Sequence, residues 1–280
     1  MVDKDEAAQA SGPAWRWAYD FGGTLILWVY FTAGFILFFA PVYLAAWIFV
    51  RDTALAFQGL NRLFYKGFFR LLARLAPAQV WRIDPQIDAI RGAVVVCNHV
   101  SYLDPLLLVA MLPRHTTVAK ARLFRIPIFG RMLKLSGYIP ATTENGQGAR
   151  VLARLEALPD ELAAGGNLFV FPEGTRGRSG EVGPLRKGVF KLARSLRTPL
   201  HVLKVEGTDR LFFPGRFAFH LTRPNTIILR HLAVLSPEEI LNAGSAQALA
   251  EKVHRLLAQS THDAAVPKRA ASSGREDEVR

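Results

Sequence analysis

The sequence predicts an α/β fold in which a mixed sheet is flanked by helices and preceded by an N-terminal membrane-embedded helical segment. Two observations lead to this prediction. Residues 21–50 contain no charged side chain, and short apolar runs alternate with helical stretches through the rest of the chain. Such alternation is typical of a sheet with helices on its faces. A chain of 280 residues is long enough for one large domain or two small ones.

The uncharged segment 21–50 predicts a membrane element. As one helix it would measure roughly 45 Å, whereas the hydrocarbon core of a bilayer measures about 30 Å. One tilted helix would absorb the excess length, and so would two helical pieces joined near Gly34 or Pro41. The length of the segment and the acidic residues before it argue against a cleaved signal peptide.

A basic amphipathic helix is predicted directly afterwards, over residues 54–76. Arg62, Lys66, Arg70 and Arg74 recur every four residues, opposite apolar positions. Like charges at this spacing weaken an isolated helix but suit one that lies on an anionic bilayer. A solvated charged face of a soluble domain is the alternative.

The remaining apolar and helical stretches predict the scaffold. Strands are expected at 93–97, 116–119, 168–171, 200–205 and 226–235. Helices are expected at 105–112, 147–164, 185–196 and 246–258. Residues 217–221 and 227–235, on either side of Pro224 and Asn225, form a local hairpin in an alternative arrangement. The polar residues 261–280, with balanced charge, predict a disordered tail.

Charge is distributed unevenly along the chain. The formal net charge is +12, and residues 1–50 carry −2 of it, which leaves +14 on the remainder. A basic body beside an apolar anchor suggests anionic lipid headgroups, phosphorylated substrates or an acidic carrier protein as partners. Nucleic acid would also suit the charge, but the chain contains no recognised nucleic-acid motif. The single cysteine, Cys97, excludes an internal disulfide and suits a reducing compartment; we expect it to be a buried strand residue.

A histidine and a carboxylate follow the first predicted strand. Residues 98–104 read Asn-His-Val-Ser-Tyr-Leu-Asp, with His99 and Asp104 five positions apart. Residues at that spacing do not face each other on one helix, so we expect the pair to sit across a strand-to-helix turn. A neutral imidazole is suited to accept a hydroxyl proton near pH 7, and a carboxylate on its other nitrogen fixes the tautomer. Because Pro105 suits the first helical position, we expect Asp104 to be the N-cap of the helix. The alternative to a catalytic pair is that Asp104 is only a helix cap and His99 only a loop residue.

A charged turn follows the strand at 168–171. Residues 171–176 read Phe-Pro-Glu-Gly-Thr-Arg. Pro172 and Gly174 bend the backbone, while Glu173 and Arg176 bring opposite charges to the end of a strand, where α/β sheets place ligands. Arg176 is able to bind a phosphate through two hydrogen bonds from its guanidinium group. The alternative for the same residues is a surface turn in which Glu173 and Arg176 form an ion pair with each other.

The two stretches together resemble the NHxxxxD and FPEGTR motifs of the glycerolipid acyltransferases, the family of the 1-acylglycerol-3-phosphate acyltransferases. The resemblance runs from about residue 94 to about residue 205. It implies that His99 is the catalytic base and Asp104 its partner. It also implies that substrate is bound by five residues, namely Lys120, Glu173, Gly174, Thr175 and Arg176.

The resemblance implies transfer of a fatty acyl chain from acyl-CoA or acyl-carrier protein to a lysophospholipid hydroxyl, without a metal or bound cofactor. The expected acceptor is 1-acylglycerol-3-phosphate. Many members carry an arginine for the acceptor phosphate where this chain has Thr143. Another lysolipid, such as a lyso-aminolipid, is therefore an alternative acceptor, and a non-catalytic membrane scaffold is an alternative function.

These expectations define a map of the chain. Residues 1–52 are expected to anchor it to a membrane, and residues 53–260 to form the acyltransferase domain, facing the cytoplasm. The cytoplasmic orientation follows from the cations that come soon after the apolar segment.

Overall fold

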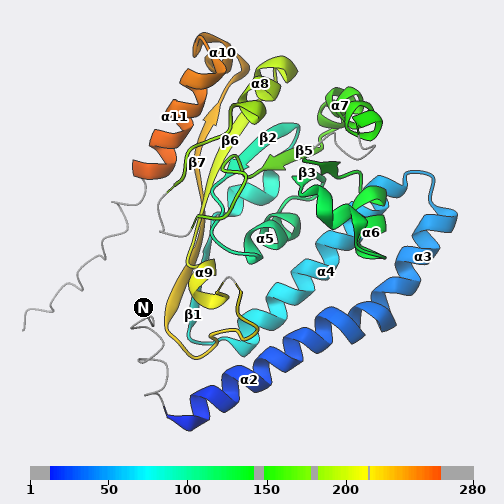
Figure 1. The fold of residues 1–280 in the computed structure, drawn as a ribbon, viewed down its shortest axis with the longest axis vertical. Coiled ribbons are helices and arrows are strands. Elements are labelled where there is room, and N and C mark those ends of the chain that lie inside the picture. The colour runs from blue at the N-terminus through cyan, green and yellow to red at the C-terminus, as the bar shows by residue number, and fades with distance from the viewer. Residues whose placement is uncertain (1–12, 142–147, 178–181, 214, 260–280) are drawn as a thin grey trace, which may run out of the picture.

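The structure is a computed structural model that describes residues 13–141, 148–177, 182–213 and 215–259. Thr143 and the predicted tail at 261–280 lie outside the described residues. Within them, seven strands form one mixed sheet in the order β1-β7-β6-β2-β5-β3-β4 (Figure 1). In chain order, the strands are β1 (Gln79–Ile83), β2 (Ala93–Cys97), β3 (His115–Ala119), β4 (Ile139–Pro140), β5 (Asn167–Val170), β6 (Leu200–Glu206) and β7 (Asn225–Leu235).

The sheet is mixed because β7 runs against β6 while every other neighbouring pair is parallel. The five predicted strands are all present, within two residues of their predicted ends. The short strands β1 and β4, at the two edges of the sheet, were not predicted. The predicted α/β class is confirmed.

Helices cover both faces of the sheet (Figure 1). On one face, Val94 and Val96 pack with residues of the helices on that side. On the other face, Val95 and Cys97 pack with residues of α4 (Thr53–Leu75) and α5 (Leu103–Met111). Because β2 is buried on both faces, its sequence is continuously apolar rather than alternating. The helices of the sheet domain are α5 (Leu103–Met111), α6 (Phe129–Leu135), α7 (Gly148–Ala163), α8 (Lys187–Leu196), α9 (Thr208–Leu211), α10 (Pro237–Asn242) and α11 (Ala246–Gln259), with short 3-10 helices η2 (Pro85–Ala89) and η3 (Ala121–Arg125).

The N-terminal apolar segment is one continuous helix. It consists of α2 (Ala14–Val29), a wide π-helical section η1 (Tyr30–Phe39) and α3 (Ala40–Phe49). By length and composition it is able to cross a membrane, and little of it is buried in the protein. Neither Gly34 nor Pro41 divides it into two pieces, so the single helix is the arrangement that the structure adopts.

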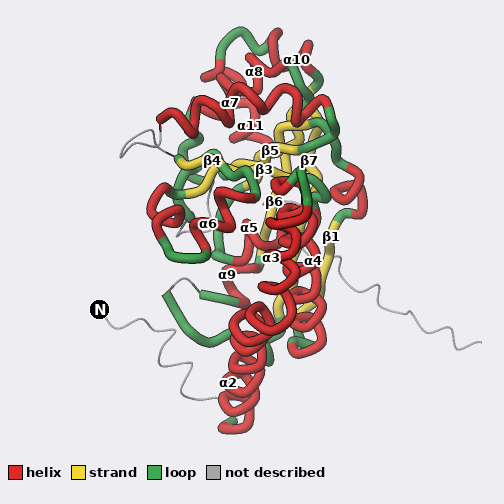
Figure 2. The backbone as a smooth tube through the Cα atoms, turned by 90° about the vertical axis from the view of Figure 1, so that its right-hand side faces the viewer, coloured by secondary structure: helices red, strands yellow, loops and turns green. Residues whose placement is uncertain are grey.

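The basic helix α4 (Thr53–Leu75) returns antiparallel to α2 and α3 along one side of the molecule (Figure 2). Its apolar residues, including Phe64, Phe68 and Leu72, are buried in protein. Arg62 and Lys66 pair with Asp88 of η2, which leaves Arg70 and Arg74 exposed. The apolar side of the helix meets the sheet domain and the apolar helix, and part of its charged side is open, so contact with a bilayer stays a prediction for that side alone.

Residues 217–221 do not form the hairpin considered as an alternative. Their backbone donors bond to side chains of α2 instead: Phe219 N–H donates to Thr24 Oγ1 at 2.9 Å, and Leu221 N–H donates to Asp20 Oδ1 at 3.0 Å. The indole N–H of Trp28 donates to the carbonyl of Phe217 at 3.3 Å. We call residues 215–222 the strap, because it ties α2 to the sheet domain.

Candidate active site

The two motifs meet at one edge of the sheet. Strands β2 and β5 are parallel neighbours, with Val96 opposite Val170. The residues that follow them therefore leave the sheet side by side, at the carboxyl ends of strands, where α/β folds bind ligands.

His99 and Asp104 form a hydrogen-bonded pair. His99 Nδ1 lies 2.9 Å from Asp104 Oδ2. A carboxylate only accepts, so Nδ1 carries the proton and the neutral ring leaves its Nε2 lone pair free for a hydroxyl proton. No hydrogen bond to Nε2 comes from any residue that the structure describes. The His99 side chain is 17% exposed while that of Asp104 is 1% exposed, so only the base is accessible from outside.

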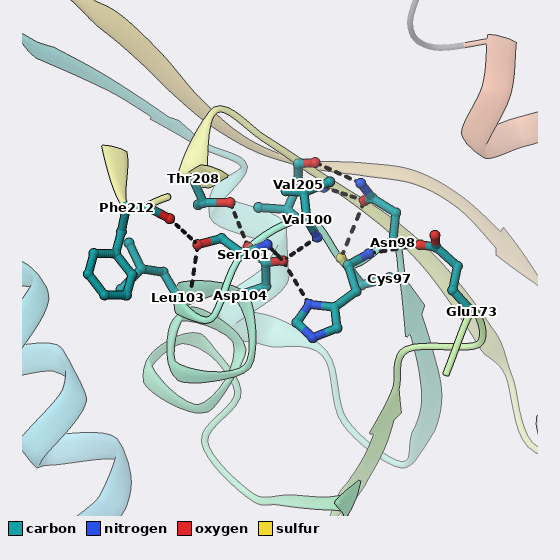
Figure 3. Close-up of polar contacts among 11 residues, drawn as sticks. Cys97, Asn98, Val100, Ser101, Leu103, Asp104, Glu173, Val205, Thr208 and Phe212 are labelled. Atoms are coloured by element: carbon teal, nitrogen blue, oxygen red, sulfur yellow. Dashed lines mark hydrogen bonds and ion pairs between the residues drawn. The ribbon is translucent and has the colours of Figure 1, made fainter. Parts of the chain in front are cut away.

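Asp104 is held by four donors (Figure 3). Its Oδ2 also accepts from the backbone N–H groups of Val100 and Ser101, both at 2.7 Å, and its Oδ1 accepts from Thr208 Oγ1 at 2.6 Å. Such bonds compensate the cost of burying a carboxylate. The N-cap prediction is wrong: α5 begins at Leu103, and Asp104 is its second residue. Its oxygens reach back to the preceding loop instead of forward into the helix.

Glu173 supports the histidine loop from the second motif. Its Oε1 accepts from the backbone N–H of His99 at 2.9 Å, and its Oε2 accepts from that of Gly183 at 3.1 Å. Burial raises the pKa of Glu173, and the two backbone bonds oppose that rise. A further bond, from Gly177 N–H to the carbonyl of His99 at 2.8 Å, joins the motifs again. Both carboxylate oxygens of Glu173 are therefore bonded within the protein, and one of them holds the backbone of His99.

Two aromatic contacts also cross between the motifs. The ring of Phe171 stacks on the imidazole of His99, with centroids 4.3 Å apart. The Arg176 guanidinium lies 3.6 Å from the centroid of the Tyr102 ring. Its Nη1 is buried and has no hydrogen-bond partner among the described residues. A buried unpaired donor of this kind is suited to an oxygen of a bound anion.

The other predicted binding residues have different surroundings. Gly174 has φ +71°, and a Cβ there would lie 2.3 Å from Arg186 Nε, so glycine is required at this turn. Thr175 is exposed beside it. Lys120 is exposed at the end of β3, and no contact with His99 or Arg176 is found in the described part of the chain. Of the predicted set, the structure brings together His99, Asp104, Glu173 and Arg176.

An apolar cavity of about 460 Å³ opens beside the histidine loop. Tyr102 and Leu103 of the loop line it on one side. The opposite walls come from the apolar helix, α4 and the residues around the strap, with Leu27, Trp28, Phe31, Phe68, Phe212, Phe217 and Phe219. The loop that carries His99 therefore borders a space suited to a hydrocarbon chain.

Cys97 has the properties of a core residue. Its side chain is fully buried, and burial, followed by the charges of Asp104 and Glu173, raises the pKa of its thiol. A buried neutral thiol is a poor nucleophile. The prediction that it is a packed strand residue agrees with this environment.

Several site residues have no signal in the sequence. Thr208 donates to Asp104 from 104 positions away, and Asn98 exchanges two hydrogen bonds with the backbone of Val205, which fixes the start of the loop against β6. Lone threonines and asparagines are too common to single out. Tyr102 and Phe171 lie inside the two motifs, but no sequence rule indicated that their rings contact the partner motif.

Comparison with known proteins agrees with the geometry. The profile of the family described as Acyltransferase matches residues 81–205, which include both motifs. This segment is therefore similar to the domains of that family. A 1-acyl-sn-glycerol-3-phosphate acyltransferase of Saccharomyces cerevisiae is 32% identical over 178 residues, which cover 62% of this chain and 57% of that protein. The chloroplastic enzyme BAT2 of Brassica napus, with the same activity in its name, is 26% identical over 168 residues, covering 58% and 48% of the two chains.

The fold of the acyltransferase domain and its apolar helix also has a solved counterpart. The crystal structure of the 1-acyl-sn-glycerophosphate acyltransferase PlsC from Thermotoga maritima superposes with a TM-score of 0.68 at 22% identity, and covers 89% of this chain and 97% of that one. At this identity the similarity establishes the fold alone. The chain spans about half the length of the curated relatives it matches.

Proposed function

We propose that this protein transfers a fatty acyl chain from an acyl thioester to the free hydroxyl of a lysophospholipid. His99 Nε2 removes the hydroxyl proton as the oxygen attacks the thioester carbonyl. The tetrahedral intermediate then breaks its C–S bond, and the proton passes from the imidazolium to the departing sulfur. The products are an ester and a free thiol, and no acyl-enzyme is formed. Asp104 stabilises the imidazolium between the two steps.

The observation that supports this proposal most strongly is the His99–Asp104 hydrogen bond. Tyr102 and Leu103, which lie between the two residues in the chain, line an apolar cavity. Four hydrogen bonds fix the side chain of Asp104, which accepts from His99 Nδ1 and so holds the imidazole in the tautomer that has Nε2 free.

For the acceptor we propose 1-acylglycerol-3-phosphate, which would give phosphatidate. Arg176 supports this choice because its unpaired Nη1 offers a charge-assisted bond to a phosphate oxygen. The relatives from yeast and Brassica are named for the same acceptor. A lysolipid with another headgroup is the second candidate, since the arginine expected at position 143 is a threonine. The donor is either acyl-CoA or acyl-carrier protein.

We further propose that the apolar helix lies along a membrane surface, with the acyltransferase domain on the cytoplasmic side. The helix contacts the domain near both ends, through Thr24 and Leu27 at one end and through Tyr43 and Ala46 at the other. Thr24 and Ala46 are 22 positions apart, which corresponds to roughly 33 Å along a helix and is close to the whole hydrocarbon thickness of about 30 Å. An upright helix would draw the cavity and α4 into the lipid, whereas a helix lying flat keeps them at the interface.

A lysolipid panel tests the reaction and the acceptor together. The purified full-length protein is mixed in detergent with acyl-CoA or acyl-carrier protein and one lysolipid, and free thiol and ester product are measured. We expect equal amounts of thiol and phosphatidate, with lysophosphatidate as the best acceptor. A scaffold would release no thiol with any acceptor. Rapid use of other lysolipids without use of lysophosphatidate would instead show that the acceptor is a different one.

A further inference from the structure

A second apolar surface lies at the turn between η3 and α6, formed by residues 126–129. Ile126 is 46% exposed, Ile128 is 73% exposed and Phe129 is 36% exposed, with the exposed Pro127 between them. Single exposed apolar side chains are common, but a run of four at the tip of one turn needs a reason. This 126–129 turn is outside the candidate active site.

Ile128 has φ +63° and ψ −62°, one of two non-glycine residues with positive φ among those described. A β-branched side chain is disfavoured there, because its Cβ crowds the neighbouring backbone. Glycine would remove the strain, and a polar residue would remove the exposed apolar surface. In water, Ile128 therefore has both a strained backbone and an exposed apolar side chain. An apolar environment for that side chain would explain why isoleucine is present.

The surroundings of the turn are uniformly cationic. Residues 105–141 contain six lysines and arginines and no aspartate or glutamate. Arg122, Arg125 and Arg131 flank the turn and are exposed, and none has an ion-pair partner in the part of the chain that the structure describes. An apolar turn flanked by arginines that have no acidic partner is complementary to a bilayer, which has an anionic surface and an apolar interior.

The 126–129 turn is also continuous with the exposed side of the apolar helix. The guanidinium of Arg131, two residues after the turn, lies 4.5 Å from the centroid of the Trp47 ring on α3. Met132 and Leu135 of α6 pack against the cluster that contains Tyr43 and Ala46 of α3. Trp47 is 44% exposed and Phe49 is 82% exposed. The turn and the end of α3 therefore form one apolar surface.

We infer that the 126–129 turn is a second membrane contact, which inserts its apolar side chains into the bilayer while the flanking arginines bind acidic headgroups. The inference rests on the proposed membrane seat of the apolar helix. An acidic carrier protein would also meet the charge, but not the continuity with an apolar helix face, so a bilayer is the partner that fits both observations. The second contact would fix the rotation of the domain about the apolar helix.

Site-specific labelling tests the inference. The only native cysteine, Cys97, is fully buried, so an environment-sensitive fluorophore attaches selectively to the variant Ile128→Cys. The matched control is Leu152→Cys, whose side chain is 58% exposed on α7, a helix whose buried leucines pack on the face of the sheet opposite to α4 and α5. Wild-type protein treated in the same way measures any labelling of Cys97. Co-flotation with vesicles of phosphatidylcholine and phosphatidylglycerol selects the bound protein.

On these vesicles we expect the label at position 128 to shift to the blue and to be quenched by lipids brominated on their acyl chains, and the label at position 152 to remain aqueous. The double variant Arg122→Gln/Arg125→Gln should lower partitioning onto anionic vesicles by roughly 30-fold at low salt, and change it little on neutral ones. An aqueous label at position 128 on protein that floats with the vesicles would overturn the inference. So would a response to soluble acyl-carrier protein without a response to vesicles. Acyl transfer is not the readout, so loss of the proposed reaction and loss of the turn contact are separate results.

Discussion

At the residue scale, Arg176 depends on an aromatic neighbour that belongs to the other motif. Its guanidinium lies 3.6 Å from the centroid of the Tyr102 ring. A contact of this type contributes about 0.5–2 kcal/mol, according to how far it is desolvated. We therefore expect Tyr102→Leu to lower kcat/KM for lysophosphatidate by roughly 3- to 30-fold, mainly through KM, whereas Tyr102→Phe keeps the ring and most of the activity. Equal kinetics for the leucine and phenylalanine variants would show that the ring has no part in acceptor binding.

Thr208 allows a second test at this scale, because its hydroxyl is one of the four donors to Asp104. In Thr208→Val the shape is kept and Asp104 loses a donor, which should cost about 1–3 kcal/mol in the free energy of unfolding and reduce turnover. The matched variant Thr208→Ser restores the hydroxyl and should recover both quantities. Urea unfolding and initial rates measure them, and a valine variant that behaves like the serine variant would contradict this role.

The site could be predicted from the sequence where chemistry and spacing were local. His99 and Asp104 follow one buried strand, β2, and the second motif follows another, β5, and the parallel pairing of these two strands brings the motifs together. The role of Glu173 was not accessible in this way, since its partners are backbone N–H groups whose direction depends on the folded loop. The prediction that Asp104 is an N-cap was wrong for a related reason. Sequence rules locate the start of a helix only to within a residue or two, and here the helix begins one residue before Asp104, so its side chain does not cap the helix.

At the scale of elements, helix α4 is joined to the sheet by a buried polar network. Asn61 accepts from the hydroxyl of Tyr43 at 2.6 Å and donates to Ser136 Oγ at 2.9 Å, and the Tyr138 hydroxyl lies 2.8 Å from His115 Nε2. His115 Nδ1 is 3.0 Å from the carbonyl of Leu112, which only accepts, so the ring is neutral with its proton on Nδ1. The network ties the apolar helix, α4 and β3 into one unit.

This network makes stability depend on pH. Burial lowers the pKa of His115 from 6.5 to about 4. Between those values the unfolded chain binds a proton that the folded protein does not, so stability is complete above pH 6.5 and is lost as the pH falls toward 4. At pH 5 the loss from this group is about 2 kcal/mol.

Urea unfolding of wild type and His115→Gln at pH 7 and pH 5 measures this effect. We expect a smaller difference between the two pH values in the variant. The control His254→Gln alters a partly buried histidine on α11 and should keep the wild-type difference. If His115→Gln also kept it, His115 would not be the group responsible.

The main elements could be predicted because their signals are periodic or continuous, as in β2 and α4. The strap and the edge strands could not. The strap is held by Asp20 and Thr24 of a helix about 200 positions away, a contact that leaves no local pattern. Strand β1 exists because β7 offers it a parallel edge, a property of the assembled sheet.

At the scale of the whole molecule, the apolar helix and the acyltransferase domain share one cavity. If that cavity holds an acyl chain, a bulky side chain inside it should shorten the chain that fits. Leu106 lines it, and we expect Leu106→Trp to shift the preferred donor to shorter chains, with a loss of roughly fourfold per excluded methylene at about 0.8 kcal/mol each. Rates with a series of acyl-CoA lengths measure the shift. Leu152→Trp, on α7, is the control, and the same length profile in both variants would place the chain elsewhere.

The central claim is that His99 is the base of an acyl transfer. Its most direct test is the rate of thiol release by His99→Ala with acyl-CoA and lysophosphatidate, alongside a melting curve that checks the fold. We expect turnover to fall by roughly 10²–10⁴-fold while the protein stays folded, because the hydroxyl loses its proton acceptor and the rest of the site remains. Wild-type turnover in a folded His99→Ala variant would contradict the account.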